Sequence, residues 1–231
     1  QEGDDEDSRE PREGDAAHQD NSAEADAVSF SLPPVAPLPE RPSFDRDVMP
    51  ILTARGCNMG ACHGKSGGQN GFALSLFGFD PDSDYFAITA SARGRRVSFA
   101  APEESLLLTK GMALVPHGGG VRLDRDGADA EVLRRWIAEG CRRAGPEEPK
   151  LSHITIHPDP RSMAPGEELQ LAVIAHDTDG SSRNVTAITA FSSNEPVVVA
   201  VKPDGLLTAG KLPGEASIMA RFMGSIATWN T

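Results

Sequence analysis

The chain has 231 residues, of which 39% are hydrophobic and 5% aromatic, and its formal net charge is −12. This length fits one large or two modest domains, and no apolar run approaches the roughly 18 residues that span a bilayer. Three cysteines are too few for a disulfide scaffold. We expect no membrane span within this chain and no nucleic-acid partner.

Most of the negative charge lies at the start of the chain. The first 26 residues hold eleven Asp or Glu against two Arg, a net charge of −9, so the remaining residues carry only −3. Such a segment has little to bury and is expected to be disordered and solvated. Prolines between residues 29 and 44 favour an extended spacer. We therefore predict a disordered acidic and proline-rich tail over residues 1–42.

A short helix is expected directly after this tail. Ser43 suits the N-cap position, and Asp45 and Asp47 suit the positive end of a helix. Pro50 is expected to kink the helix, which then delivers the chain to Cys57. The apolar residues of the segment fall on one helical face: Phe44, Val48, Ile51 and Leu52.

Three further elements are predicted before residue 141. Residues 71–88 start as an extended apolar run and turn at DPDSD, residues 80–84. Residues 102–110 open with Pro and acids and close with Lys, as a short helix does. Residues 126–140 form an amphipathic helix with Gly140 as its C-terminal stop. The residues of this helix expected to face inward are Val132, Leu133, Trp136 and Ile137.

The sequence changes character at residues 142–150, RRAGPEEPK, a polar and proline-bearing join typical of a domain boundary. Six short segments rich in β-branched residues follow, separated by Gly, Pro, Asn and Asp. This spacing predicts an all-β sandwich over residues 151–231. His153, His157 and His176 fall within these segments and are expected to be surface or turn residues. The segments are residues 151–158, 168–177, 184–193, 196–202, 205–210 and 215–224.

The stretch GCNMGACHGKSGG, residues 56–68, carries most of the functional information. Covalent attachment of haem needs two cysteine sulfurs for its two vinyl groups and a histidine whose ring nitrogen reaches the iron, which is why C-x-x-C-H indicates c-type attachment. Here Cys57 and Cys62 stand five residues apart, with His63 next. On a regular helix such positions lie roughly 140° apart. The two extra residues must therefore bulge, and Gly60 and Ala61 are small enough to allow it.

Spacing alone leaves three explanations open. Haem c would use both cysteines and His63. A Cys57–Cys62 disulfide is sterically possible and would make His63 incidental. Zinc would need two further ligands, for which Cys141 and His117 are available, although zinc cysteines usually come as two closely spaced pairs.

Residues 43–140 resemble the cytochrome-c-like domain of large planctomycete surface and periplasmic proteins, in the subgroup with a C-x₄-C-H haem motif. The resemblance is carried by FDRDVMPILTARGCNMGACHGKSGGQNGFALSLFGFDP, then by SLLLTKGMALVPHGGGVRL and RRWIAEGC. It implies covalent haem c on Cys57, Cys62 and His63 and a periplasmic or surface location. Residues 43–145 are thus expected to form a small, mainly helical haem domain.

The segment that follows resembles the bacterial Ig-like domain of group 2. The matching features are ITIHPDPRSMAPGEELQLAVIAHDTDGSSRNVT and then FSSNEPVVVAVKPDGLLTAGKLPGEASIMARFMG. The resemblance implies a spacer or adhesion domain without catalytic residues. In proteins of this kind an Ig-like module commonly follows the haem domain, and larger domains follow in turn. We therefore expect this chain to belong to a longer protein with further C-terminal domains.

A low-spin cytochrome needs a second strong iron ligand opposite His63, and the usual donors are His and Met. Met59 lies inside the attachment loop and Met49 on the approach helix, which leaves the loop GMALVPHGGG. His117 is the predicted ligand because Pro116 stiffens its backbone, flexible glycines follow it, and PHGGG stands at this place in the resembling family. Met112 is the alternative. Residues that could meet the haem propionates are Arg122, Arg95 and Lys65.

The sequence thus predicts an exported electron-transfer protein rather than an enzyme, with covalent haem c as cofactor and a protein of unknown identity as redox partner. Two rivals remain. One is a surface adhesion module closed by a Cys57–Cys62 disulfide. The other is a haem-based sensor or enzyme in which the iron keeps an open position. Cys141 is expected to be a small packing residue.

Overall fold

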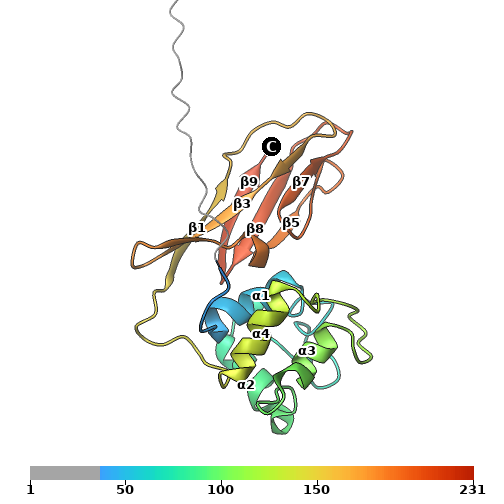
Figure 1. Ribbon diagram of the computed structural model, residues 1–231. Coiled ribbons are helices and arrows are strands. Elements are labelled where there is room, and N and C mark those ends of the chain that lie inside the picture. The colour runs from blue at the N-terminus through green and yellow to red at the C-terminus, as the bar shows by residue number, and fades with distance from the viewer. Residues whose placement is uncertain (1–36) are drawn as a thin grey trace, which may run out of the picture. The chain divides into compact units, whose positions relative to one another are not determined.

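The computed structural model describes residues 37–231, so most of the predicted tail over residues 1–42 lies outside the described residues. A helical region, residues 44–141, precedes a mainly β region of three small antiparallel sheets (Figure 1). The predicted order of helices followed by strands is confirmed. Across residues 37–231, no helix is both long and apolar enough to cross a membrane.

The helical region consists of short elements joined by long loops (Figure 1). Its α-helices are α1 (Met49–Ala54), α2 (Pro81–Thr89), α3 (Leu106–Gly111) and α4 (Ala128–Ala138). A π-helical turn, η1 (Phe44–Val48), runs directly into α1. Single 3₁₀ turns are η2 (Leu76–Gly78), η3 (Ser91–Gly94) and η4 (Pro102–Glu104).

Ser43 occupies the N-cap position of the first helical segment as predicted, but it caps the segment differently. The Ser43 backbone N–H donates to the Asp47 carboxylate at 2.8 Å, while the Ser43 side chain makes no capping bond. Pro50 is the second residue of α1, which directly follows η1, so the change from π to α geometry falls beside a residue that cannot donate a backbone hydrogen bond. The predicted apolar face is buried: Phe44, Val48, Ile51 and Leu52.

Helix α2 begins where the sequence predicted only a turn. The Asp80 side chain accepts from the Ser83 backbone N–H at 3.1 Å, and Pro81 occupies the first helical position. Both are strong N-terminal signals, so the DPDSD stretch starts a helix. The segment 102–110 is also split, because η4 and α3 are separated at Ser105.

Helix α4 agrees with its prediction, and Gly140 ends it with a φ of 85°. The helix packs in the core of the helical region. Trp136 is fully buried, and its ring centre lies 5.8 Å from that of Phe44. Other buried residues of this core include Leu74, Ile88, Leu108, Leu123, Val132, Leu133, Ile137 and Cys141.

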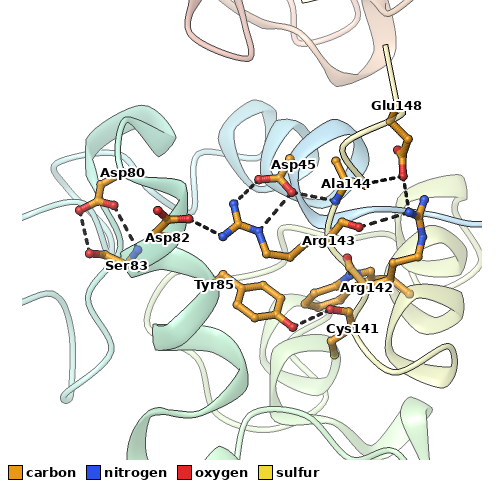
Figure 2. A network of polar contacts seen from close by, with 12 residues as sticks. Asp45, Asp80, Asp82, Ser83, Tyr85, Cys141, Arg142, Arg143, Ala144 and Glu148 are labelled. Carbon is orange, nitrogen blue, oxygen red and sulfur yellow. Dashed lines mark hydrogen bonds and ion pairs between the residues drawn. The ribbon is translucent and has the colours of Figure 1, made fainter. Parts of the chain in front are cut away.

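The polar join at residues 142–150 is held against the helical region by its charges (Figure 2). Arg143 pairs with Asp45 at 2.6 Å and with Asp82, and the Ala144 backbone N–H donates to Asp45 at 3.0 Å. Arg142 pairs with Glu148. The polar composition that predicted a boundary therefore also fastens the join to η1 and α2.

The β region contains nine strands in three antiparallel sheets, with orders β1-β3-β4, β2-β7-β6 and β5-β8-β9. Each of the six predicted segments contains at least part of a strand. The strands are β1 (Leu151–His157), β2 (Glu168–Gln170), β3 (Ala172–Asp177), β4 (Ser182–Asn184), β5 (Ala190–Ser193), β6 (Val199–Val201), β7 (Leu206–Ala209), β8 (Ser217–Phe222) and β9 (Ser225–Asn230).

Two features of these sheets differ from the prediction. The segment 168–177 breaks at Leu171, so that β2 pairs with β7 while β3 pairs with β1 and β4. Strand β9 was not predicted at all. It forms a hairpin with β8 through Met223 and Gly224, whose φ angles of 47° and 81° are typical of a two-residue primed turn.

Buried contacts connect the β region to η1. Arg46 donates to the Asp177 carboxylate at 2.7 Å, and the exposed fractions of these two side chains are only 15% and 1%. Ile188 packs both against the helical core and against a β-region core around Val173 and Phe222. The helical and β regions thus share two largely buried charge pairs, Arg46 with Asp177 and Asp47 with Arg183 at 4.0 Å, and an apolar contact.

Candidate functional site

The Cys57–His63 loop follows α1 as a series of tight turns. The His63 backbone N–H donates to the Cys57 carbonyl at 2.9 Å, and the Gly64 N–H donates to the Met59 carbonyl at 3.0 Å. The first of these bonds spans six residues instead of the four of an α-helix. The prediction that the two extra residues leave helical geometry is therefore confirmed.

The loop after His63 contains an Asn-Gly turn that sets the position of Phe72. Asn70 and Gly71 have φ angles of 49° and 72°, and Gln69 and Phe72 exchange backbone hydrogen bonds across them. This is the pattern of a type I′ turn. The turn presents the Phe72 carbonyl to the His63 ring, whose Nδ1 lies 2.8 Å from that oxygen.

The His117 loop lies between α3 and α4. The His117 Nδ1 lies 2.9 Å from the Gly120 carbonyl oxygen, so the imidazole folds back over its own loop. A Cβ atom added at Gly119 would lie 2.9 Å from the His117 ring. Glycine at this position therefore makes room for the imidazole.

The structure brings His63 and His117 together as a parallel pair. Their ring centres are 6.4 Å apart and their planes differ by 7°. Since a carbonyl oxygen can only accept, Nδ1 of each ring carries the proton and Nε2 is the basic nitrogen in the neutral form. Within residues 37–231, neither Nε2 atom has a hydrogen-bond partner.

The surroundings of His63 favour its neutral form. Burial lowers its pKa, the hydrogen bond to Phe72 opposes this, and the charges of His117 and Arg96 lower the pKa further. A neutral imidazole with Nδ1 bound to a main-chain carbonyl is the usual state of a metal-ligating histidine.

The two motif cysteines are half-buried free thiols in this structure. Burial raises the pKa of Cys57 to about 11, opposed by the charge of Arg122. Cys141 is buried beneath the last helical turn, and burial raises its pKa to about 12. Within residues 37–231, no cluster of three or more His, Cys, Asp or Glu is arranged to hold a bare metal ion.

The remaining predicted site residues occupy different surroundings. Arg122 donates to the Gly119 carbonyl at 2.8 Å, and a second guanidinium nitrogen lies 3.9 Å from the Cys62 sulfur, so it links the His117 loop to the cysteine loop. Met112 is buried in the helical core, with an exposed fraction of 9%. Lys65 and Arg95 are exposed.

Exposed apolar side chains lie on both histidine loops. Met59 precedes His63 by four residues, and its exposed fraction is 45%, while Leu114 and Val121 flank His117 with 51% and 69%. Each of these side chains thus leaves apolar surface in water on a loop that carries one of the two histidines.

Sequence reasoning missed two residues of this site. Phe72 supplies the carbonyl to His63, and Arg96 packs on the Phe72 ring with its guanidinium carbon 4.4 Å from the ring centre. The Asn-Gly dipeptide could have indicated the turn that positions Phe72. Arg96 offers no such local signal, because its partners come from three separate segments.

Comparisons with known proteins do not assign this site. No protein-family model matches the chain, and the curated proteins compared with it include no significant match.

Proposed function

We propose that this protein is an exported c-type cytochrome in which His63 and His117 would both bind the iron of a covalently attached haem. The observation that carries this proposal is the parallel His63–His117 pair. Two imidazole nitrogens that each bound one iron at about 2 Å would place their ring centres roughly 6 Å apart. The separation of 6.4 Å fits that requirement.

The hydrogen bonds of the pair support the same assignment. Both rings hold Nδ1 against a main-chain carbonyl, which leaves each Nε2 as the coordinating atom. The buried position of Met112 in the helical core argues for His117 as the second ligand. With two histidines bound, the iron would keep no open position, which disfavours a sensor or an oxygen-activating enzyme.

The cysteines and nearby groups complete the fit. Cys57 and Cys62 would each form a thioether by adding their S–H across a vinyl group of the haem. Arg122 would hold the His117 loop beside Cys62, and the apolar Met59, Leu114 and Val121 side chains would cover the ring. The bound haem supplies one-electron redox chemistry.

The β region fits the proposed group 2 Ig-like sandwich as a spacer or adhesion module, in line with its small antiparallel sheets. Because haem c is attached outside the cytoplasm, we place the protein in the periplasm or at the cell surface. Its partner would be another redox protein, and further domains would follow in a longer polypeptide.

Denaturing mass spectrometry of the protein, produced together with a haem-maturation system, tests covalent attachment. We expect one haem retained per chain, and its loss when Cys57 and Cys62 are both changed to Ser. A colourless protein with a Cys57–Cys62 disulfide would instead support the adhesion module.

Replacing His117 with Ala tests the second ligand. We expect a high-spin spectrum and carbon monoxide binding to the reduced protein, whereas Met112→Leu should keep the low-spin spectrum. An unchanged low-spin spectrum in His117→Ala would refute this ligand assignment.

A further inference from the structure

Arg96 is a buried cation that packs on the Phe72 ring. Its exposed fraction is 5%, and its guanidinium donates to the carbonyls of Ala87, Ser91 and Gly71 at 2.9, 3.0 and 2.9 Å. None of the ion pairs found among residues 37–231 involves Arg96. A buried charge without a counter-ion is costly, so its retention calls for a reason.

The backbone just before Arg96 adopts an unfavourable conformation. Ala92 and Arg93 have φ angles of 54° and 64°, a left-handed conformation that is unfavourable for a residue with a side chain. The strained turn folds the chain so that Arg96 can bond back to Ala87 and Ser91. The strained segment is therefore the one that positions the Arg96 guanidinium.

Phe72 connects Arg96 to His63. The guanidinium carbon lies 4.4 Å from the Phe72 ring centre, and the His63 ring centre lies 4.5 Å from the same point. The Phe72 carbonyl accepts the His63 Nδ1–H, and the neighbouring Gly71 carbonyl is held by Arg96. Phe72 therefore contacts Arg96 with its ring, and it contacts His63 with both its ring and its carbonyl.

We propose that Arg96 is a positioning residue for the His63 ligand, and that its fixed positive charge raises the reduction potential of the haem. This rests on the haem assignment proposed above. A nearby positive charge disfavours the oxidised, more positive iron, and in the weakly screened interior its effect is larger than at the surface. It also disfavours negative charge on the His63 ring, which acts in the same direction.

Reduction potentials of neutral and charged variants separate this role from a merely structural one. We expect Arg96→Gln to lower the ratio of reduced to oxidised haem about tenfold at a fixed potential, a shift of about 59 mV for one electron. The matched control is Arg95→Gln, which removes the same charge from an exposed position and should change the ratio less than twofold. Equal potentials in Arg96→Gln and the wild type would overturn the proposal.

Arg96→Lys keeps the proposal testable if the glutamine variant does not fold. A buried lysine loses its proton at a lower pH than an exposed one. The potential of Arg96→Lys should therefore fall by a shift of similar size between about pH 7 and about pH 10, while that of the wild type changes much less. Parallel pH curves for the two proteins would overturn the role of the charge.

A haem-free readout distinguishes failure of this proposal from failure of the haem assignment. In the chain made without haem maturation, ¹⁵N NMR should show His63 mainly as the Nδ1–H tautomer, and Arg96→Gln should lower the Nδ1–H to Nε2–H ratio at least threefold. A chain that never binds haem would refute the cytochrome, and this ratio would still report on Arg96. An unchanged ratio would refute the positioning role.

Discussion

The helical and β regions each contain a pair of parallel histidines, and the two pairs are built differently. In the helical region the ring centres of His63 and His117 are 6.4 Å apart, whereas in the β region those of His153 and His176 are 4.5 Å apart, with planes 12° apart. The closer pair follows from strand register, because His153 on β1 lies directly opposite His176 on β3.

The nitrogen atoms of the two pairs are also used differently. Both nitrogens of His176 meet hydroxyl groups, Nδ1 that of Ser182 at 2.9 Å and Nε2 that of Thr155 at 3.0 Å. Among the residues that the structure describes, the loop pair bonds only through Nδ1, and only to main-chain carbonyls. Parallel histidines are therefore not informative in themselves. The separation of the rings and the nitrogen that remains available distinguish a ligand pair from a cross-strand contact.

The largest difference between the pairs should appear on deleting one member of each. His63→Ala removes a proposed axial ligand, and we expect it to reduce the low-spin haem absorption at least tenfold. His176→Ala removes a ring from the β-region pair and should leave that absorption unchanged. Visible spectra of the two purified variants measure this absorption, and equal spectra would show that the two histidine pairs do not differ in haem binding.

The helical and β regions that contain the two pairs are joined by the buried ion pair between Arg46 and Asp177. Arg46→Ala leaves the buried Asp177 carboxylate without its closest cation, and we expect a loss of about 3 kcal/mol in the free energy of unfolding. The more exposed pair between Arg161 and Glu167 is the control, and Arg161→Ala should cost less than about 1 kcal/mol. Urea unfolding measures both, and similar losses would show that the join contributes little.

A smaller effect is expected at the glycines of the His117 loop. In Gly119→Ala the added methyl group would push the imidazole away from the Gly120 carbonyl. Loss of this hydrogen bond would cost about 1 kcal/mol, which lowers the fraction of six-coordinate haem roughly fivefold. Gly118→Ala is the matched control, because nothing lies within 4 Å of its added Cβ. Carbon monoxide binding to the reduced variants reports this fraction, and equal binding would contradict the steric argument.

The smallest effect concerns the β-region pair. Burial, and then the charges of His153 and His157, lower the pKa of His176 from 6.5, while Asp177 opposes the shift. The unfolded chain then binds the proton first, so stability present above pH 6.5 declines as the pH falls toward the folded-state pKa. His176→Gln should flatten the decline in thermal stability between about pH 7.5 and about pH 5.5. A decline of the same slope in this variant would exclude His176 as its source.

The fold was predictable where local pattern and tertiary packing agree. Helix α4 has an apolar face and a C-terminal glycine, and both hold in the structure. Helix α2 was missed because Asp, Pro and Ser serve both turns and helix N-termini. Strand β9 was missed because its hairpin uses Met223 with Gly224 instead of Asn-Gly.

The candidate site was predictable only in part. The motif and the loop PHGGG contain chemistry that can be inferred from residue types, which is why Cys57, Cys62, His63 and His117 could be named. Their relative placement depends on the packing of two loops more than fifty residues apart along the chain. Arg96 could not be found, since a buried arginine bound to carbonyls has the same sequence appearance as its exposed neighbour Arg95.

The hydrogen-bond partners of the two loop histidines have a consequence for how this site tolerates sequence drift. Both partners are carbonyl oxygens of the main chain, those of Phe72 and Gly120. Replacement of the Phe72 side chain leaves its carbonyl in place. Gly120 has no side chain, and its φ of 69° means that a substitution there would strain the turn that presents its carbonyl. Selection then acts on the conformation of the two loops more than on the identity of the partners. Distant descendants of this chain could therefore keep both ring orientations while sharing few of the residues that surround them.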